Sequence, residues 1–251
     1  MQLGFIGAGN MAAALARGWG EPVLCTDSGS GRAAALAQEL GGEALGSNRE
    51  LAERADVVIL AHKPAQLGEV AGEIAGAAKA VVSLLAGATQ ADVRAVYPDT
   101  PVLRVEPNTP AEVGQGVLAF AIPDAPVDEQ LHAAIKERFA ALGTVVEVPE
   151  RLMVVAGASS GVAPAYWALL VEAWVDAAVR RGMPVATAQE LVIGGMAGTA
   201  ELLQRRYGGD TLALRRAVAS PGGTTARGLA ALERGGVRAA LADAMDSVVD
   251  A

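Results

Sequence analysis

Residues Leu3 to Ala12 have the sequence LGFIGAGNMA, and this stretch decides which fold we expect for the first part of the chain. Leu3–Ile6 is a short apolar run without charge, which is typical of a strand buried on both faces. Met11–Trp19 is rich in Ala, Leu and Arg, which favour helix. A strand, a glycine turn and a helix in this order are the setting in which GxGxxA predicts a dinucleotide site. The alternative is a plain glycine-rich turn.

The small residues of the turn each have a physical role in such a site. Gly7 allows the tight turn, and Gly9 has no side chain to block a pyrophosphate. Ala12 lets the helix lie close to its strand. Asn10 and Met11 open the helix, whose unpaired N–H groups and positive dipole end favour a diphosphate.

Composition limits the class of protein. The 251 residues suffice for one large domain or two modest ones, and 20 Lys and Arg against 28 Asp and Glu give a net charge of −8, which argues against a nucleic-acid partner. The single cysteine, Cys25, lies in an apolar run and is expected to be a buried thiol, and no Cys–His cluster suggests a metal. No basic and apolar leader precedes the first strand, so we expect a cytoplasmic protein.

One stretch, Leu152–Val171, carries no charge and is long enough to span a bilayer. It contains glycines, serines and Pro164, which predict a break in the helix. We therefore expect two buried helices of a soluble protein, with no membrane partner.

The first 150 residues alternate between strand-like and helix-like runs. We expect strands over 3–6, 23–26, 56–61, 80–85, 102–105, 117–122 and 144–148, and helices over 11–19, 33–40, 64–77, 89–96 and 127–142. Such repeated units predict an α/β fold, in which a parallel sheet is covered by helices on both faces. Residues 1–150 are thus predicted to be a Rossmann-type dinucleotide-binding domain, with its ligand at the carboxyl ends of the strands.

Residues 151–251 are predicted to form a separate all-helical domain. Helices are expected over 165–181, 186–207, 211–218, 225–234 and 237–249. Small residues over 194–198 allow close helix packing, and charges are few, so part of the apolar surface is expected to meet a second subunit. The alternative is a self-contained bundle.

Asp27 follows the second predicted strand, about twenty residues beyond the first glycines. An acidic group there can bind the ribose 2′-hydroxyl of NAD and repel a 2′-phosphate, although it can also be a helix cap. Ser28, Ser30 and Arg32 follow and could accommodate that phosphate. Asp27 favours NAD over NADP.

Nucleophilic catalysis has no support, because no Ser–His–Asp or Cys–His arrangement can be assembled around His62 and His132. A nicotinamide would bring the hydride itself, and the protein would then orient a substrate. Residues 220–225 (SPGGTT) immediately precede a predicted helix. The N–H groups of this turn suit a small anion such as a carboxylate, or form an ordinary capped turn between helices.

Several motifs together resemble those of the pyrroline-5-carboxylate reductase family. They occur in the family's order over nearly the whole chain: GAGNM at 7–11, KP at 63–64, RVEPNTP at 104–110, SGVAPAY at 160–166 and SPGGTT at 220–225. The resemblance implies reduction of L-1-pyrroline-5-carboxylate to L-proline, the last step of proline synthesis, by NADPH or NADH. It also implies a homodimer, or an assembly of dimers, with interlocking helical domains.

The resemblance assigns site residues by position. It places Asn48 and Lys63 in the cofactor site, and Asn108 with Thr109 near the nicotinamide. The Thr225 hydroxyl would face the imine nitrogen as the catalytic group. The substrate carboxylate would be held by the loop of Ser220, Gly223, Thr224 and Thr225.

Three positions depart from the family pattern. Val162 and Ala163 stand where the family has Ser and Gly, and Glu106 stands where it has Met. Glu106 could pair with an iminium cation, but the frequency of exposed glutamates favours a position in solvent. The departures leave two alternatives open, a reductase of a related cyclic imino acid and a non-catalytic nucleotide sensor. A hydroxyacid dehydrogenase is disfavoured, because those enzymes use a lysine of the second domain and no lysine follows Lys136.

Overall fold

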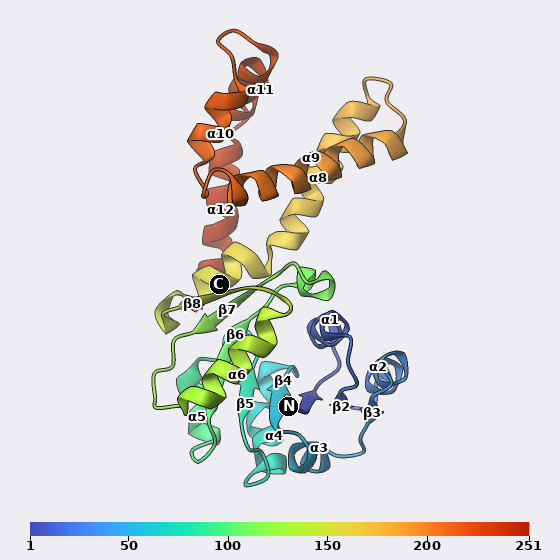
Figure 1. Ribbon diagram of the computed structural model, residues 1–251, viewed down its shortest axis with the longest axis vertical. Coiled ribbons are helices and arrows are strands. Elements are labelled where there is room, and N and C mark those ends of the chain that lie inside the picture. The colour runs from blue at the N-terminus through green and yellow to red at the C-terminus, as the bar shows by residue number, and fades with distance from the viewer. Residues whose placement is uncertain (251) are drawn as a thin grey trace. The chain divides into compact units, whose positions relative to one another are not determined.

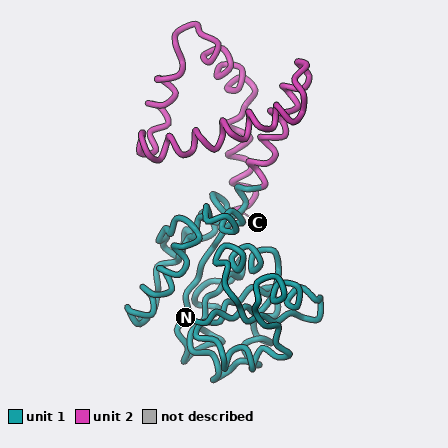
Figure 2. Tube along the Cα trace, turned by 45° about the vertical axis from the view of Figure 1, so that its right-hand side comes forward, with its two compact units in different colours: residues 1–164 teal, residues 165–251 magenta. Residues whose placement is uncertain are grey.

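An eight-stranded sheet with the strand order β3-β2-β1-β4-β5-β6-β7-β8 is the framework of the first part of the chain (Figure 1). The computed structural model describes residues 1–250 and divides by its contacts into Met1–Pro164 and a second unit from Ala165 onward (Figure 2). The strands are β1 (Leu3–Ile6), β2 (Leu24–Thr26), β3 (Glu43–Ala44), β4 (Val57–Leu60), β5 (Val81–Ser83), β6 (Val102–Glu106), β7 (Gly116–Ala121) and β8 (Gly143–Val148).

Helices cover both faces of this sheet, as predicted. The first unit contains α1 (Asn10–Trp19), α2 (Arg32–Leu40), α3 (Asn48–Arg54), α4 (Leu67–Ile74), α5 (Gln90–Val96) and α6 (Glu129–Ala140), with 3-10 helices η1 (Pro64–Gln66) and η2 (Thr109–Val113). Helices α1, α2 and α6 pack on one face around Phe5, Phe120 and Phe139, and α3, α4 and α5 pack on the other around Leu51 and Ile74 (Figure 1). Cys25 is fully buried, as expected.

The sheet is not parallel throughout, and on this point the prediction is wrong. Strands β1 to β6 pair in parallel, but β7 runs antiparallel to β6, and β8 is again parallel to β7. The link from Glu106 to Gly116 contains only the short helix η2, whereas a parallel crossover needs a dozen or more residues. The chain therefore reverses direction there, and α6 supplies the parallel crossover to β8.

The second unit is helical. It comprises most of α8 (Ala163–Val179), then α9 (Val185–Arg205), α10 (Thr211–Val218), α11 (Thr224–Arg234) and α12 (Val237–Val249) (Figure 1). No strand occurs among residues 149–250, as predicted. The boundary expected near residue 150 stays a prediction.

These helices bury very little of their own apolar surface. None of the residues described in α11 and α12 is buried, and Trp167 and Trp174 are 53% and 64% exposed in the single chain. A self-contained bundle is therefore the wrong alternative, because such a bundle buries its large apolar side chains inside. Large apolar side chains of these helices, including both tryptophans, are thus left uncovered by the described residues of the chain.

The apolar stretch Leu152–Val171 lies in one helical run, Glu150–Val179, with a break in its middle. The run consists of η3 (Glu150–Leu152), α7 (Met153–Ala156), the π-helical turn η4 (Gly157–Gly161) and α8. By length and composition alone this run could cross a membrane. The break is where we expect it, but the expected burial is wrong, since only 6% of the most apolar window is buried.

Candidate active site

The glycine turn lies at the carboxyl ends of β1 and β4, where the strand order reverses direction. Gly7 has a backbone φ of 97°, which residues other than glycine rarely adopt. Its N–H donates to the Thr26 carbonyl at 3.0 Å. A Cβ at Gly7 would lie 2.7 Å from the carbonyl carbon and oxygen of Ala61. This position requires glycine, as predicted, because the turn packs directly on the end of β4.

The start of α1 fits a diphosphate. Gly9 is the N-cap of the helix, and in residues 1–250 no side chain caps this end, so its first N–H groups stay available. A Cβ added at Gly9 would meet no described heavy atom within 4 Å, so the space above the glycine is open. Asn10 and Met11 are the first two residues of α1, at the positive end of its dipole.

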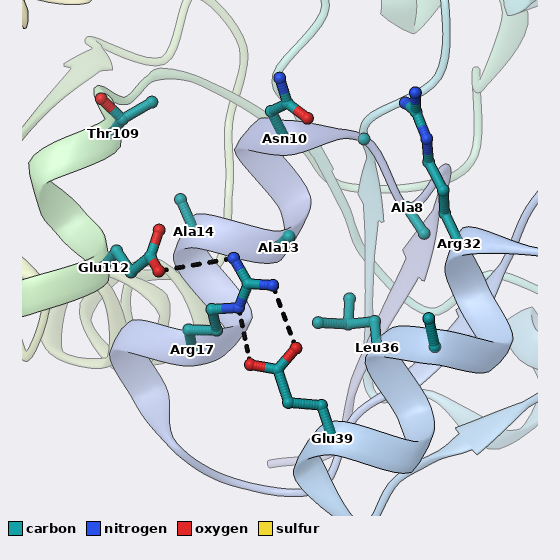
Figure 3. Close-up of a pocket in the computed structure, with 12 residues that line it drawn as sticks. Ala8, Asn10, Ala13, Ala14, Arg17, Arg32, Leu36, Glu39, Thr109 and Glu112 are labelled. Carbon is teal, nitrogen blue, oxygen red and sulfur yellow. Dashed lines mark hydrogen bonds and ion pairs between the residues drawn. The ribbon is translucent and has the colours of Figure 1, made fainter.

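A cavity of about 390 Å³ opens beside this turn (Figure 3). Its lining brings together Gly9 and Asn10 from the start of α1, Arg32 from α2, and Thr109 from η2. At one side Arg17 Nε pairs with Glu39 at 2.8 Å and Arg17 Nη1 with Glu112 at 3.4 Å. The predicted residues Gly9 and Asn10 thus share one cavity with the predicted residue Thr109, which lies far from them in the sequence.

Asp27 follows β2, and its carboxylate makes contacts typical of a helix cap. It accepts hydrogen bonds from Gly29 N (2.8 Å), Ser30 Oγ (2.8 Å) and Ala33 N (2.9 Å). The backbone donor of Ala33 is the largest cause that lowers the pKa of Asp27, so the carboxylate stays ionised. The predicted contact of Asp27 with a ribose stays a prediction.

Asn48 and Lys63, both predicted in the cofactor site, come after β3 and β4 in the chain. Asn48 begins α3, where its Oδ1 accepts from Thr26 Oγ1 and its Nδ2 donates to Glu73, both at 2.5 Å. Lys63 follows β4 and is exposed, next to His62, whose pKa is lowered by burial. These contacts fix the orientation of the Asn48 amide.

Asn108 connects the end of β6 to two other segments. The side chain is buried, 5% exposed, and its Oδ1 accepts from Val117 N at 2.8 Å. Its Nδ2 donates to the Ser160 carbonyl in the π-helical turn at 3.1 Å. Thr109, the next residue, begins η2 and lines the cavity.

A buried charge network lies on β6 beside Asn108, and sequence reasoning missed it. Arg104, 3% exposed, donates to Glu150 at 2.7 Å and to Glu106 at 3.0 Å. Glu150 also accepts from the backbone N and the side-chain Nε2 of Gln90. The alternation of charged and apolar residues along β6 gave no signal that Arg104 points inward.

Glu106 does not point into solvent, and that interpretation is wrong. Its side chain is 17% exposed, and an ideal Cβ at Gly157 would lie 3.9 Å from its Oε2. Burial raises the pKa of Glu106, although the hydrogen bond and charge of Arg104 oppose the shift. Arg104 holds the carboxylate inward because a buried guanidinium needs an anionic partner.

The loop of Ser220, Gly223, Thr224 and Thr225 belongs to the second unit. Gly223 N donates to the Ser220 carbonyl at 3.0 Å and closes the turn, and Gly222 has a φ of 71°. Gly223 is the N-cap of α11, and Thr224 and Thr225 are its exposed first residues. The N–H groups at this helix start resemble those at Gly9, which makes the loop a suitable cradle for a carboxylate.

Fold and site define a nucleotide-dependent oxidoreductase with a Rossmann-type domain and a helical second part. Residues 2–87 match the family model described as NADP oxidoreductase coenzyme F420-dependent, and residues 150–251 match the model of pyrroline-5-carboxylate reductase dimerisation. The chain belongs to the pyrroline-5-carboxylate reductase family.

Individual relatives cover between 79% and 100% of the chain. Pyrroline-5-carboxylate reductase of Synechocystis is 42% identical over 79% of this chain and 74% of its own. The Escherichia coli enzyme is 34% identical over 99% and 96%. The crystal structure of the Streptococcus pyogenes enzyme superposes with a TM-score of 0.90 at 30% identity, covering 100% of this chain and 97% of its own. That of the Plasmodium falciparum enzyme, with NADP bound, superposes with a TM-score of 0.88 at 27% identity over 100% and 96%.

Proposed function

We propose that this protein reduces L-1-pyrroline-5-carboxylate to L-proline with NADPH or NADH, the last step of proline biosynthesis. The observation that carries the proposal is the joint presence of an open dinucleotide cradle at Gly9 and a family match over the whole chain. Relatives with this activity in their names are 33–42% identical to this chain over the aligned residues.

The cofactor is proposed to lie across the carboxyl ends of β1 and β4. The diphosphate would be held by the first turn of α1 at Gly7, Gly9, Asn10 and Met11, because the N–H groups there are uncapped. Asp27 and Asn48 would flank the adenosine half with Lys63, and Asn108 and Thr109 the nicotinamide half. The bound nicotinamide nucleotide supplies the hydride.

The substrate is proposed to bind at the SPGGTT loop. The backbone N–H groups of Thr224 and Thr225 would hold its carboxylate, and Gly223 would shape the turn through its hydrogen bond to the Ser220 carbonyl. The Thr225 hydroxyl would face the imine nitrogen. The carbon of the C=N bond accepts the hydride and the nitrogen ends protonated. A cyclic iminium is already electrophilic, so positioning supplies most of the acceleration.

The oligomer is proposed to be a homodimer, or an assembly of dimers, through the helical unit. Support comes from the dimerisation family model over residues 150–251 and from the exposed side chains of Trp167, Leu169 and Trp174. The same contacts would cover the apolar helical run, which needs no membrane partner. We further propose a cytoplasmic protein that binds no nucleic acid, in keeping with its net charge of −8.

Steady-state oxidation of NADPH and NADH with racemic pyrroline-5-carboxylate tests the activity. We expect turnover that is inhibited by L-proline. Turnover that is faster with another cyclic imino acid would favour the related reductase, and cofactor binding without any turnover would favour the nucleotide sensor.

A further inference from the structure

Within the helical run Glu150–Val179, one backbone carbonyl lacks its usual hydrogen-bond donor from the helix. In an α-helix the carbonyl of Ser160 would accept from the N–H of residue 164, four positions later. Residue 164 is proline, which has no N–H and whose ring clashes with that carbonyl. The helix responds with the π-helical turn Gly157–Gly161, in which Val162 N reaches back to the Gly157 carbonyl at 3.2 Å.

Asn108 supplies the donor that Pro164 removes. Its Nδ2 lies 3.1 Å from the Ser160 carbonyl, while its Oδ1 accepts from Val117 N at 2.8 Å. The backbone N–H of Val117 can only donate and the Ser160 carbonyl can only accept, so these partners settle the orientation of the amide. Only an amide of this length offers both a donor and an acceptor here, because aspartate lacks the donor and leucine lacks both.

The same turn lies close to the end of β6 at its two glycines. Ideal Cβ atoms at Gly157 and Gly161 would lie 3.9 Å from Glu106 Oε2 and 4.0 Å from the Pro107 carbonyl oxygen. The turn therefore follows residues 106–108 closely. These are the residues that lead into Thr109, at the proposed nicotinamide end of the site.

We propose that Asn108, at the nicotinamide end of the site, is a positioning residue for hydride transfer, whose amide donates to the Ser160 carbonyl left free by Pro164 and makes no hydrogen bond to the cofactor. The proposal rests on the proposed function. Asn108 holds the π-helical turn beside the nicotinamide end, and Pro164 is the last residue of the first unit, from which the chain continues to the SPGGTT loop. A displacement of about 1 Å in such a support can cost 10²-fold in rate.

A double-mutant cycle between Asn108 and Pro164 tests this assignment. Asn108→Asp keeps the acceptor for Val117 but replaces the donor, and Pro164→Ala gives Ser160 a backbone N–H partner. We expect Asn108→Asp to lower kcat at least tenfold with KM for NADPH within threefold. In the Pro164→Ala background the same change should cost less than threefold. Pro184→Ala, at the N-cap of α9 in the second unit, is the matched control and should not alter the effect of Asn108→Asp.

Equal losses from Asn108→Asp in both backgrounds would overturn the proposal, as would a rise in KM for NADPH that matches the fall in kcat. Backbone hydrogen exchange of residues 157–163 gives a readout that needs no activity. Exchange should accelerate in Asn108→Asp and return towards the wild-type rate in the double variant. If the wild type has no reductase activity, the proposed function fails, and the exchange cycle alone decides this inference. If Asn108→Asp does not fold, recovery by Pro164→Ala supports the coupling, and failure of both variants overturns it.

Discussion

Arg104 Nη1 lies 2.7 Å from Glu150 Oε1, and this contact joins β6 to the first turn of the helical run that leaves the sheet. Arg104 is 3% exposed and also holds Glu106, so one guanidinium pairs with two carboxylates. Without the guanidinium, Glu106 would be largely buried with no cation beside it, and Glu150 would keep only the uncharged donors of Gln90.

Replacement of Arg104 by Met should therefore destabilise the fold severely. We expect a loss of about 3–5 kcal/mol, since two partly buried carboxylates remain without their cation. Glu150→Gln keeps an acceptor for Arg104 and Gln90 and should cost only about 1–2 kcal/mol. Urea unfolding measures both variants. Similar small losses for both would show that the network does not hold the helical run in place.

Alanine at Gly9 should weaken cofactor binding, whereas alanine at Gly7 should lower the stability of the fold. Gly9→Ala adds a methyl group where the chain leaves open space, so we expect stability within about 0.5 kcal/mol of wild type and KM for the cofactor raised about tenfold. Gly7→Ala meets a positive φ and the backbone of Ala61, so it should lose about 1–3 kcal/mol of stability. Cofactor titration and thermal unfolding separate the effects. Unchanged cofactor affinity in Gly9→Ala would place the diphosphate elsewhere.

Arg32 should distinguish the two cofactors. It is the first residue of α2 and lines the cavity beside Gly9, where a 2′-phosphate would meet its charge. We expect Arg32→Ala to raise KM for NADPH about tenfold and to leave KM for NADH within about twofold. Arg17→Ala is the control, because Arg17 lines the same cavity but is already paired with Glu39 and Glu112. An equal effect on both cofactors would exclude a 2′-phosphate contact at Arg32.

Thr225→Ala should lower the turnover number much more than it lowers the affinity for the cofactor. Loss of a hydroxyl that faces the reacting nitrogen removes an interaction of the transition state, and we expect kcat to fall about 10²-fold. Thr225→Ser, which keeps the hydroxyl, should recover most of the rate. Parallel kinetics and cofactor titrations are the measurement. An equal loss in kcat and in cofactor affinity would contradict the assigned role.

Glu106 should make stability depend on pH in a direction opposite to an ordinary surface carboxylate. Burial raises its pKa in the folded state, so the folded protein binds the proton more tightly than the unfolded chain does. The contribution of Glu106 to stability then falls as pH rises from the unfolded pKa through the folded one. Glu106→Gln, which still accepts from Arg104, should gain in Tm relative to wild type as pH rises from acid to neutral values. A constant difference in Tm across this range would contradict the shift.

Helix-capping and turn motifs in the sequence correctly predicted the elements that they begin or connect. Thr89 caps α5 in a capping box with Asp92, as its position before the helix indicates, and the glycine turn lies where the pattern places it. The two-residue strand β3 and the helix α3 capped by Ser47 were missed, because an edge strand so short shows no periodicity.

The tertiary contacts of the site were less predictable. Arg104, Glu106 and Glu150 are separated by up to 46 positions, and nothing local shows that they share one buried network. The reversal at β7 depends on the length of a link and not on the residues of the strand. The partner of Asn108 follows from Pro164 only when the carbonyl of Ser160 is known to need a donor.

The exposed tryptophans of α8 have a thermodynamic consequence for any work with this protein. Helices that bury so little by themselves draw much of their folding free energy from association, so their melting temperature rises with protein concentration. We expect dilution alone to loosen residues 165–250, at temperatures where a concentrated sample remains intact.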